Sequence, residues 1–314
     1  MLIVNFSMKK SLPKIYGLIG YPVKHSLSPA MHNAAFRECK IDAEYRLFEV
    51  KPENLRGFLQ GNIDVEDTNG NSILAEKVEG FNITVPYKVK TLQTPVKEIA
   101  VRYDNELVVL TGAINTVKRI GDKLIYRNTD AQGFVKSLRE DLKFNTVDKN
   151  ILLIGCGGAG RAIIAGLMQA GMGVKKIFVC DSNKESVDSA KRHFSTQSDI
   201  VEDRLEFIYD NEKVVEVVTQ CQLVVNATPI GMKEGDNCSA IDKNLLRKDL
   251  YVYDVVYNRE TQLIKDAKEK KCKGVAGGLG MLLYQGVLAW EFWMNQSAPV
   301  EVMRKALNDK LGII

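Results

Sequence analysis

The sequence lacks several features that would identify a membrane, metal-binding or nucleic-acid-binding protein. No stretch of about 18 apolar residues occurs, so no transmembrane helix is predicted. The 6 cysteines include no C-x-x-C pair and indicate reduced thiols, and the 3 histidines have no metal-ligand spacing. A net charge of +4 is too small to indicate a nucleic-acid-binding protein. The N-terminus has no basic start of a signal peptide, so we expect a cytoplasmic location.

Apolar residues make up 45% of the 314 residues, which is enough for two cored domains. From about residue 150, short apolar runs alternate with helical patterns such as 161–170. Runs that are apolar throughout are typical of parallel strands covered on both faces by helices. This half is therefore predicted to be doubly wound. The runs cover residues 151–154, 177–180, 205–209, 223–225 and 251–256, with a last short strand near Val275.

The first half mixes predicted strands and helices and forms a separate α/β domain. Its predicted strands are 15–19, 45–50 and 81–85, and its predicted helices are 30–39 and 52–59. Residues 62–71 are polar and turn-rich, which favours a surface insertion. A helix over 130–142 is expected to connect the domains, and the helical last 30 residues are expected to return to the first domain.

A glycine-rich loop follows the first strand of the second half. It reads Gly155-Cys-Gly157-Gly158-Ala159-Gly160 and opens a helix. Gly155 permits the tight turn, Gly157 lets the backbone approach a pyrophosphate, and Gly160 lets helix and strand pack closely. The helix N-terminus adds N–H donors for phosphates. The alternative is a glycine-rich turn without a ligand, but the strand and helix around the loop favour a dinucleotide site.

Asp181 ends the next predicted strand. A carboxylate there accepts a hydrogen bond from the ribose 2′-hydroxyl and repels a 2′-phosphate, so the residue chemistry favours NAD over NADP. The only close cation is Lys184. The alternative is that Asp181 only caps the following helix.

Four segments of the first half are rich in small polar residues. They contain Ser26 and Ser28, then Thr84 and Lys88, then Asn115, then Asp130. Each has an ordinary structural alternative: Ser28 and Asp130 suit helix N-caps, and a lysine is usually solvated. Pro86 has to end the preceding strand, which leaves Lys88 at a strand exit.

These segments together resemble the shikimate dehydrogenase family. Its motifs G-x-P-x-x-H-S-x-S-P-x-x-H-N, N-x-T-x-P-x-K, G-A-x-N-T and N-T-D-x-x-G occur in order over residues 20–133. The dinucleotide loop G-x-G-G-A-x-R-A follows at 155–162, and further matches lie at 226–232, 254–258 and 278–285. The resemblance covers residues 15 to 290.

The resemblance implies reversible reduction of 3-dehydroshikimate to shikimate in aromatic amino-acid (chorismate) biosynthesis, with NAD(P) as cofactor. The family resemblance favours NADP, whereas the residue chemistry at Asp181 favours NAD. It makes Lys88 and Asp130 the catalytic pair, and a positioned Lys–Asp pair can relay the hydroxyl proton when hydride leaves a carbinol carbon. Substrate-binding residues would be Ser26, Ser28, Thr84, Asn115, Tyr257 and Gln285. Cofactor-binding residues would be Gly155, Gly157, Gly158, Ala159, Gly160, Arg161, Asp181, Asn226, Ala227, Thr228, Val255 and Gly278.

The implied architecture is an N-terminal α/β substrate-binding catalytic domain (1–129) and a Rossmann-type dinucleotide-binding domain (130–279). Helices in 280–314 would pack back on the first domain. The partner would be a small-molecule substrate, with no nucleic acid or membrane, and the protein a monomer or homodimer.

The sequence departs from the family at three places. Arg127 stands where glycine usually precedes N-T-D, an insertion occupies about 62–78, and Asp181 replaces the Asn-Arg-Thr pattern of NADP-dependent members. The alternative function is an NAD-dependent quinate/shikimate dehydrogenase, although the intact Ser26 and Ser28 pair resembles shikimate-selective members. A more remote alternative is a non-catalytic dinucleotide-binding sensor.

Overall fold

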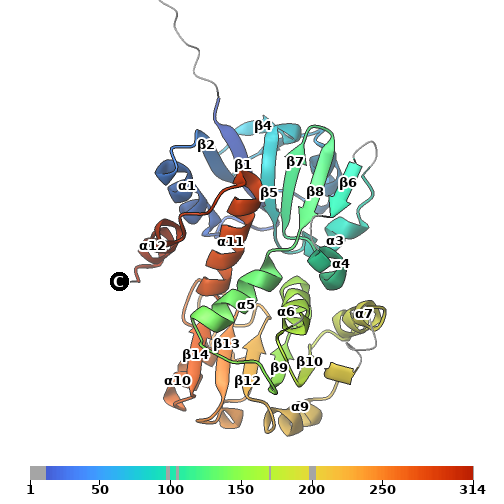
Figure 1. Ribbon diagram of the computed structural model, residues 1–314, viewed down its shortest axis with the longest axis vertical. Helices are drawn as coiled ribbons and strands as arrows, with labels where there is room; N and C mark the ends of the chain where they lie inside the picture. The colour runs from blue at the N-terminus through green and yellow to red at the C-terminus, as the bar shows by residue number, and fades with distance from the viewer. Residues whose placement is uncertain (1–11, 97–99, 104–105, 170, 198–202, 314) are drawn as a thin grey trace, which may run out of the picture.

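A computed structural model describes residues 12–96, 100–103, 106–169, 171–197 and 203–313. Figure 1 shows two lobes stacked along the long axis, and the chain passes between them through helices α5 (Asp130–Glu140) and α11 (Leu279–Met294). Among the described helices, none combines the length and apolarity needed to cross a membrane.

The second lobe contains a six-stranded sheet whose strands are all parallel, in the order β11-β10-β9-β12-β13-β14. The order reverses between β9 and β12, as in the Rossmann fold, and this confirms the predicted fold class. Leu153 packs with the cluster that contains α6, whereas Leu152 packs on the opposite face with α9 and α10. The strands are β9 (Asn150–Ile154), β10 (Lys176–Cys180), β11 (Leu205–Ile208), β12 (Leu223–Asn226), β13 (Tyr251–Asp254) and β14 (Gly274–Gly277); the helices are α6 (Gly158–Met168), α7 (Lys184–Ser195), α9 (Asn211–Val218) and α10 (Gln262–Glu269).

The first lobe contains a mixed six-stranded sheet in the order β2-β1-β5-β7-β8-β6. Strands β1, β2 and β5 are parallel, and β7 and β8 form an antiparallel pair beside β5. The strands are β1 (Lys14–Gly20), β2 (Ala43–Glu49), β5 (Val78–Ile83), β6 (Ala100–Tyr103), β7 (Thr116–Ile120) and β8 (Lys123–Arg127); the helices are α1 (Ser28–Glu38), α2 (Leu55–Gln60), α3 (Tyr87–Gln93) and α4 (Glu106–Thr111).

The structure corrects the bounds of one predicted strand of this lobe. The strand expected over 81–85 is β5, which begins at Val78 and ends at Ile83, because the backbone turns where the Tyr87 N–H bonds to the Thr84 carbonyl. In the polar segment that was predicted to be a surface insertion, β3 (Asp64–Glu66) pairs with β4 (Ser72–Leu74) in a hairpin.

Helices α11 and α12 (Val300–Leu311) pack on the first lobe. The Trp293 indole donates to the Val117 carbonyl at 2.9 Å, and its ring lies 5.3 Å from that of Tyr16. Trp290 is fully buried against Phe36 of α1. The last helices of the chain therefore complete the core beneath the first sheet.

His32 of α1 is fully buried in this core, with its ring stacked on Tyr45 at a centroid distance of 4.4 Å. Within the described residues neither ring nitrogen has a hydrogen-bond partner. Burial disfavours the charged imidazolium and lowers the pKa of His32 to about 3. The native state therefore requires a neutral ring at this position.

This ring should make the fold sensitive to acid. The folded pKa lies below the unfolded value of about 6.5, so the unfolded state binds more protons and stability falls as pH drops from about 6.5 towards 3. At pH 5 the expected loss from His32 is about 2 kcal/mol. Urea unfolding at pH 7.5 and pH 5 would show a smaller difference in His32→Phe than in the wild type. The exposed His25, changed to Gln, serves as control; equal pH dependence in all three proteins would contradict the assignment.

Candidate active site

Lys88 and Asp130 meet where the two lobes join. The Lys88 ammonium donates to Asp130 Oδ2 at 2.7 Å, and the side chains are 17% and 5% exposed. Lys88 lies in the first turn of α3 and Asp130 is the first residue of α5. Asp130 does not cap its helix, because the N-cap is Thr129 and no side-chain cap bond forms. The carboxylate is thus directed at the lysine rather than at the backbone.

Asn115 holds the other carboxylate oxygen of Asp130. Its amide nitrogen lies 2.9 Å from Asp130 Oδ1, 2.8 Å from the Thr129 hydroxyl and 3.4 Å from Gln285 Oε1. Its own oxygen accepts the Thr129 backbone N–H at 2.7 Å. Side chains from the start of β7, the start of α5 and the middle of α11 are therefore joined around one carboxylate.

The approach of Gln285 depends on a glycine in α5. A Cβ added to Gly133 would lie 2.8 Å from the backbone nitrogen of Gln285 and 2.9 Å from its Cβ. Such distances leave no room for a side chain. Gly133, the last residue of the N-T-D-x-x-G motif, thus lets α11 cross α5 closely enough to bring Gln285 to Asn115.

Ser26, Ser28 and Tyr257 form a second polar group. The two serine hydroxyls lie 3.2 Å apart, and the side chain of Tyr257, which follows β13 of the second lobe, interacts with Ser26. Burial raises the pKa of Tyr257, so its hydroxyl stays protonated at neutral pH. Ser28 is 4% exposed and makes no cap bond to α1. The group therefore bridges both lobes.

Buried side chains connect the two polar groups. The Ser28 side chain interacts with Tyr45, whose hydroxyl donates to Asn82 Oδ1 at 2.8 Å. The Asn82 amide donates to the Asn115 carbonyl at 3.1 Å and to the Thr116 hydroxyl at 3.0 Å. The motifs contained Asn82 and Thr116 without assigning them a role, whereas Tyr45 carried no sequence signal. Thr84 follows β5 and packs beside Gly20 without a described hydrogen bond to either group.

The glycine-rich loop lies directly beside the Lys88 side chain. A Cβ on Gly158 would lie 3.0 Å from the Cβ and 3.1 Å from the Cδ of Lys88. Gly155 has φ +99°, which strongly favours glycine, and a Cβ on Gly160 would lie 2.1 Å from the Gly155 carbonyl oxygen. At Gly157 an added Cβ would meet no atom within 4 Å. Protein packing does not require glycine there, and the open space fits a pyrophosphate.

Asp181 is held by the same loop. Its Oδ2 accepts the Cys156 backbone N–H at 3.0 Å, and its Oδ1 accepts the Asn183 N–H at 2.9 Å. Asn183, not Asp181, caps α7, since its side chain accepts the Ser186 N–H. The carboxylate is therefore fixed at the carboxyl end of β10, next to the loop.

The predicted cofactor residues between positions 226 and 278 lie at the carboxyl ends of β12, β13 and β14. Asn226 donates to Asp254 at 3.0 Å and accepts from the Thr228 hydroxyl at 2.6 Å. Burial raises the pKa of the Asp254 carboxyl. A Cβ on Gly155 would touch the Ala227 carbonyl carbon at 2.9 Å, and one on Gly278 would lie 2.0 Å from the Val255 carbonyl oxygen. Ala159 follows Gly158 in the first turn of α6. Ligands of doubly wound sheets bind at this edge.

Two arginines that the sequence singled out contact neighbouring helices. Arg127 directs its guanidinium over the Phe292 ring of α11, 4.2 Å from the centroid. Arg161 begins in the loop, but its guanidinium donates to the Ser189 hydroxyl of α7 at 2.9 Å. Its side chain thus points towards α7. Within the described residues, no group of three or more acidic, histidine or cysteine side chains could hold a metal ion.

Comparisons with known proteins identify the family of the chain. Residues 18–117 match the model of the shikimate dehydrogenase substrate binding domain, and residues 278–307 match that of the shikimate 5′-dehydrogenase C-terminal domain. The shikimate dehydrogenase (NADP(+)) of Desulforamulus reducens is 35% identical over 95% of this chain and 96% of its own.

Solved structures give the same result. The crystal structure of shikimate dehydrogenase from Aquifex aeolicus has a TM-score of 0.78 at 34% identity, covering 96% of this chain and 100% of its own. Shikimate 5-dehydrogenase from Listeria monocytogenes, in complex with shikimate and NAD, has a TM-score of 0.77 at 28% identity over 95% of this chain and 97% of its own. The chain belongs to the shikimate dehydrogenase family.

Proposed function

We propose that this protein is an NAD(P)-dependent oxidoreductase that interconverts 3-dehydroshikimate and shikimate. The observation that carries the proposal is the 2.7 Å contact between Lys88 and Asp130 beside the dinucleotide loop. We assign substrate binding to residues 1–129 and dinucleotide binding to 130–279. On the family's pattern and the reduced cysteines, we further propose a cytoplasmic monomer or homodimer.

In the proposed mechanism, Lys88 and Asp130 handle the proton of the reacting hydroxyl. When bound in the loop at 155–160, a nicotinamide cofactor would supply or accept the hydride at the carbinol carbon. The hydroxyl proton therefore needs an acceptor in one direction and a donor in the other. Asp130 orients the Lys88 ammonium, and Asn115 in turn fixes Asp130. The pair can therefore keep one geometry in both directions.

We propose that the two polar groups bind the substrate. Hydroxyls and amides both donate and accept, which suits a ligand with one carboxylate and several alcohols. Asn115 and Gln285 lie at the catalytic pair, and Ser26, Ser28 and Tyr257 lie in the second group. Thr84, at the exit of β5, is the sixth proposed contact.

For the cofactor, we propose NAD in preference to NADP. Gly155, Gly157, Gly158, Ala159 and Gly160 would hold the pyrophosphate, and Asn226, Ala227, Thr228, Val255 and Gly278 would line the nicotinamide side. Asp181, fixed by two backbone N–H groups, would accept the ribose 2′-hydroxyl and repel a 2′-phosphate. One relative is named as an NADP(+) enzyme, and another was solved in complex with NAD. The names of relatives therefore do not decide between the two cofactors, and the proposal depends on Asp181.

The deciding experiment measures initial rates of shikimate and quinate oxidation, each with NAD and with NADP. We expect the highest kcat/KM for shikimate with NAD. Asp181→Asn keeps the shape and removes the charge, and should shift the NADP-to-NAD ratio of kcat/KM by about 10- to 100-fold, since like charges in contact cost several kcal/mol. Glu216→Gln, an exposed charge on α9, should leave the ratio unchanged.

Other outcomes select the alternatives. Comparable quinate activity with NAD would favour a quinate/shikimate dehydrogenase, which the name of the Desulforamulus reducens relative does not favour. NADP preference that Asp181→Asn leaves unaltered would remove Asp181 from cofactor selection. No turnover with any pair would favour the sensor.

A further inference from the structure

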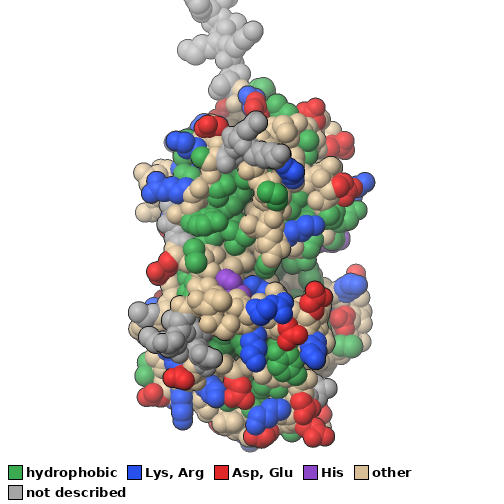
Figure 2. Space-filling model, turned by 90° about the vertical axis from the view of Figure 1, so that its right-hand side faces the viewer, with side chains coloured by type: hydrophobic (Ala, Val, Ile, Leu, Met, Phe, Trp, Pro, Cys, Tyr) green, Lys and Arg blue, Asp and Glu red, His purple; other side chains and the backbone are tan. Residues whose placement is uncertain are grey.

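A cavity of about 340 Å³ lies between the lobes, on the side where α3, α4 and α7 meet. Figure 2 faces this side and shows hydrophobic side chains gathered on the upper lobe, above the waist of the molecule. Val109 and Tyr103 are 53% and 49% exposed, so solvent reaches the rim. The cavity is lined by Val89, Leu92, Gln93, Tyr103, Val108, Val109, Gly112, Arg161 and His193.

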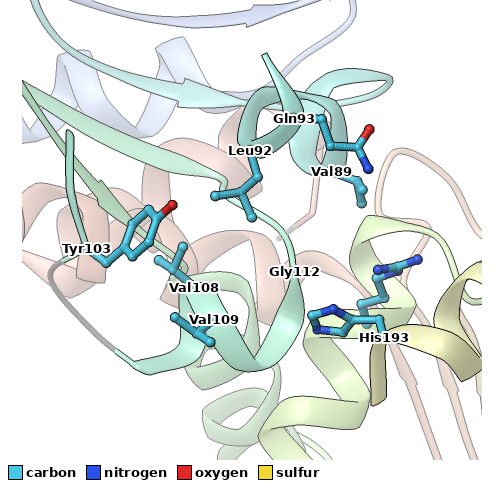
Figure 3. Close-up of a pocket in the computed structure, with 9 residues that line it drawn as sticks. Val89, Leu92, Gln93, Tyr103, Val108, Val109, Gly112 and His193 are labelled. Carbon is cyan, nitrogen blue, oxygen red and sulfur yellow. The ribbon is translucent and has the colours of Figure 1, made fainter. Parts of the chain in front are cut away.

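The walls of the cavity are mainly aliphatic. Figure 3 shows Leu92 and Val89 from α3 on one side and Val108 and Val109 from α4 on another, with the His193 ring below Gly112. His193 Nε2 is already hydrogen-bonded to the Leu110 carbonyl at 3.0 Å. Burial lowers the pKa of His193 and keeps the ring neutral at pH 7. The lining offers few partners to the hydroxyls of a sugar-like molecule.

Arg161 supplies a buried positive charge to this apolar space. The residue is 6% exposed, and within the described residues its guanidinium has one hydrogen-bond partner, the Ser189 hydroxyl, and no carboxylate within ion-pair distance. A guanidinium has five N–H donors, and burying its charge without a counter-ion is costly. The donors left over therefore indicate an anionic ligand.

We propose that this cavity binds a small carboxylic acid with an apolar ring, whose carboxylate pairs with Arg161. Bidentate pairing with a carboxylate suits a guanidinium, and the aliphatic walls suit the ring. The volume is at the low end of ligand pockets, about 300–1,000 Å³, which fits a single ring with a short acidic arm. The site is separate from the proposed nicotinamide site, because the Arg161 side chain points towards α7 and not over the strand ends.

Because α3 and α4 belong to the first lobe and α6 and α7 to the second, a ligand here contacts both. It would bind the arrangement of lobes seen in this structure more tightly than a more open one. The proposed dinucleotide loop also contacts the first lobe, because Gly158 lies against the Lys88 side chain. Affinity for dinucleotide is then coupled to occupancy of the cavity, and the coupling has to be reciprocal.

The test uses phenylacetate and its neutral analogue phenylacetamide as probes, with ligand-observed NMR titration of the full chain. We expect phenylacetate to bind at least about tenfold more tightly than the amide, which is the loss expected for one charge-assisted hydrogen-bonding pair. Arg161→Gln should weaken phenylacetate binding by a similar factor. Val109→Asp places a negative charge at an exposed rim position and should do the same without disturbing the fold.

Val215→Asp is the matched control, because Val215 is also a half-exposed helical valine, on α9 of the second lobe. It should bind phenylacetate as the wild type does. Equal affinity for the acid and the amide, or unchanged binding in Val109→Asp, would overturn the proposal. Full competitive displacement of phenylacetate by NAD alone, or by shikimate alone, would also overturn it, by assigning the anion to the dinucleotide or substrate site.

Discussion

Lys88→Met is expected to lower kcat by about 10²- to 10⁴-fold while changing dinucleotide affinity by no more than about twofold, the range expected for loss of a general acid–base group. Methionine keeps the aliphatic stem that lies against Gly158, so the loop beside it retains its packing partner. It removes only the ammonium that Asp130 holds. Reduced nicotinamide absorbance gives kcat, and its fluorescence titration gives the dissociation constant.

Lys90→Met provides the control, since Lys90 is exposed on the same short helix. It should retain wild-type kcat, which excludes a general effect of losing a positive charge from α3. If Lys88→Met lost dinucleotide binding together with turnover, Lys88 would have a structural role at the lobe junction, and the proton relay would be wrong.

Gly160→Ala is expected to abolish dinucleotide binding and to destabilise the second lobe. The new Cβ would lie 2.1 Å from the Gly155 carbonyl oxygen, a backbone atom that cannot move without opening the loop. Overpacking of this kind costs about 1–3 kcal/mol or more. Gly157→Ala has no such clash, because no atom lies within 4 Å of the added carbon. Its melting temperature should equal that of the wild type.

Comparing Gly160→Ala with Gly157→Ala therefore distinguishes an effect on stability from an effect on dinucleotide binding. Gly157→Ala should raise the dinucleotide dissociation constant by about 10- to 100-fold, because the added methyl group occupies the space proposed for the pyrophosphate. Thermal unfolding and fluorescence titration of both variants test this. Unchanged dinucleotide affinity in Gly157→Ala would mean that the phosphates do not lie over this residue.

The second lobe was easier to predict from the sequence than the first. Runs such as 151–154 are buried on both faces in a parallel sheet, so their hydrophobicity is continuous and their direction is unambiguous. Strands β7 and β8 mix buried and exposed positions. In β8, for example, the buried Leu124 and Tyr126 alternate with more exposed residues, and β7 ends at the exposed Ile120. Such short mixed strands give only a weak signal, and they were missed.

The candidate site was predicted by motif and could not have been predicted by local pattern alone. Asn115 and Gln285 are 170 positions apart in the sequence, and their contact depends on how closely α11 crosses Gly133. Tyr45, which links Ser28 to Asn82, occupies an ordinary buried strand position. The position of Arg161 after the glycine-rich loop could be predicted from the sequence. The direction of its side chain could not, because it depends on a hydrogen bond to Ser189 of α7.

The return of α11 and α12 to the first lobe has a consequence for protein synthesis. A ribosome makes the first lobe's strands early, yet Trp290 and Trp293, which complete the core under them, are made only after the second lobe. The whole second lobe emerges between these two parts, and its sheet consists of consecutive chain segments that can pair as they appear. We therefore expect the second lobe to fold first during translation. Until α11 is synthesised, the first lobe lacks part of its core, and we expect it to bind chaperones that hold nascent chains.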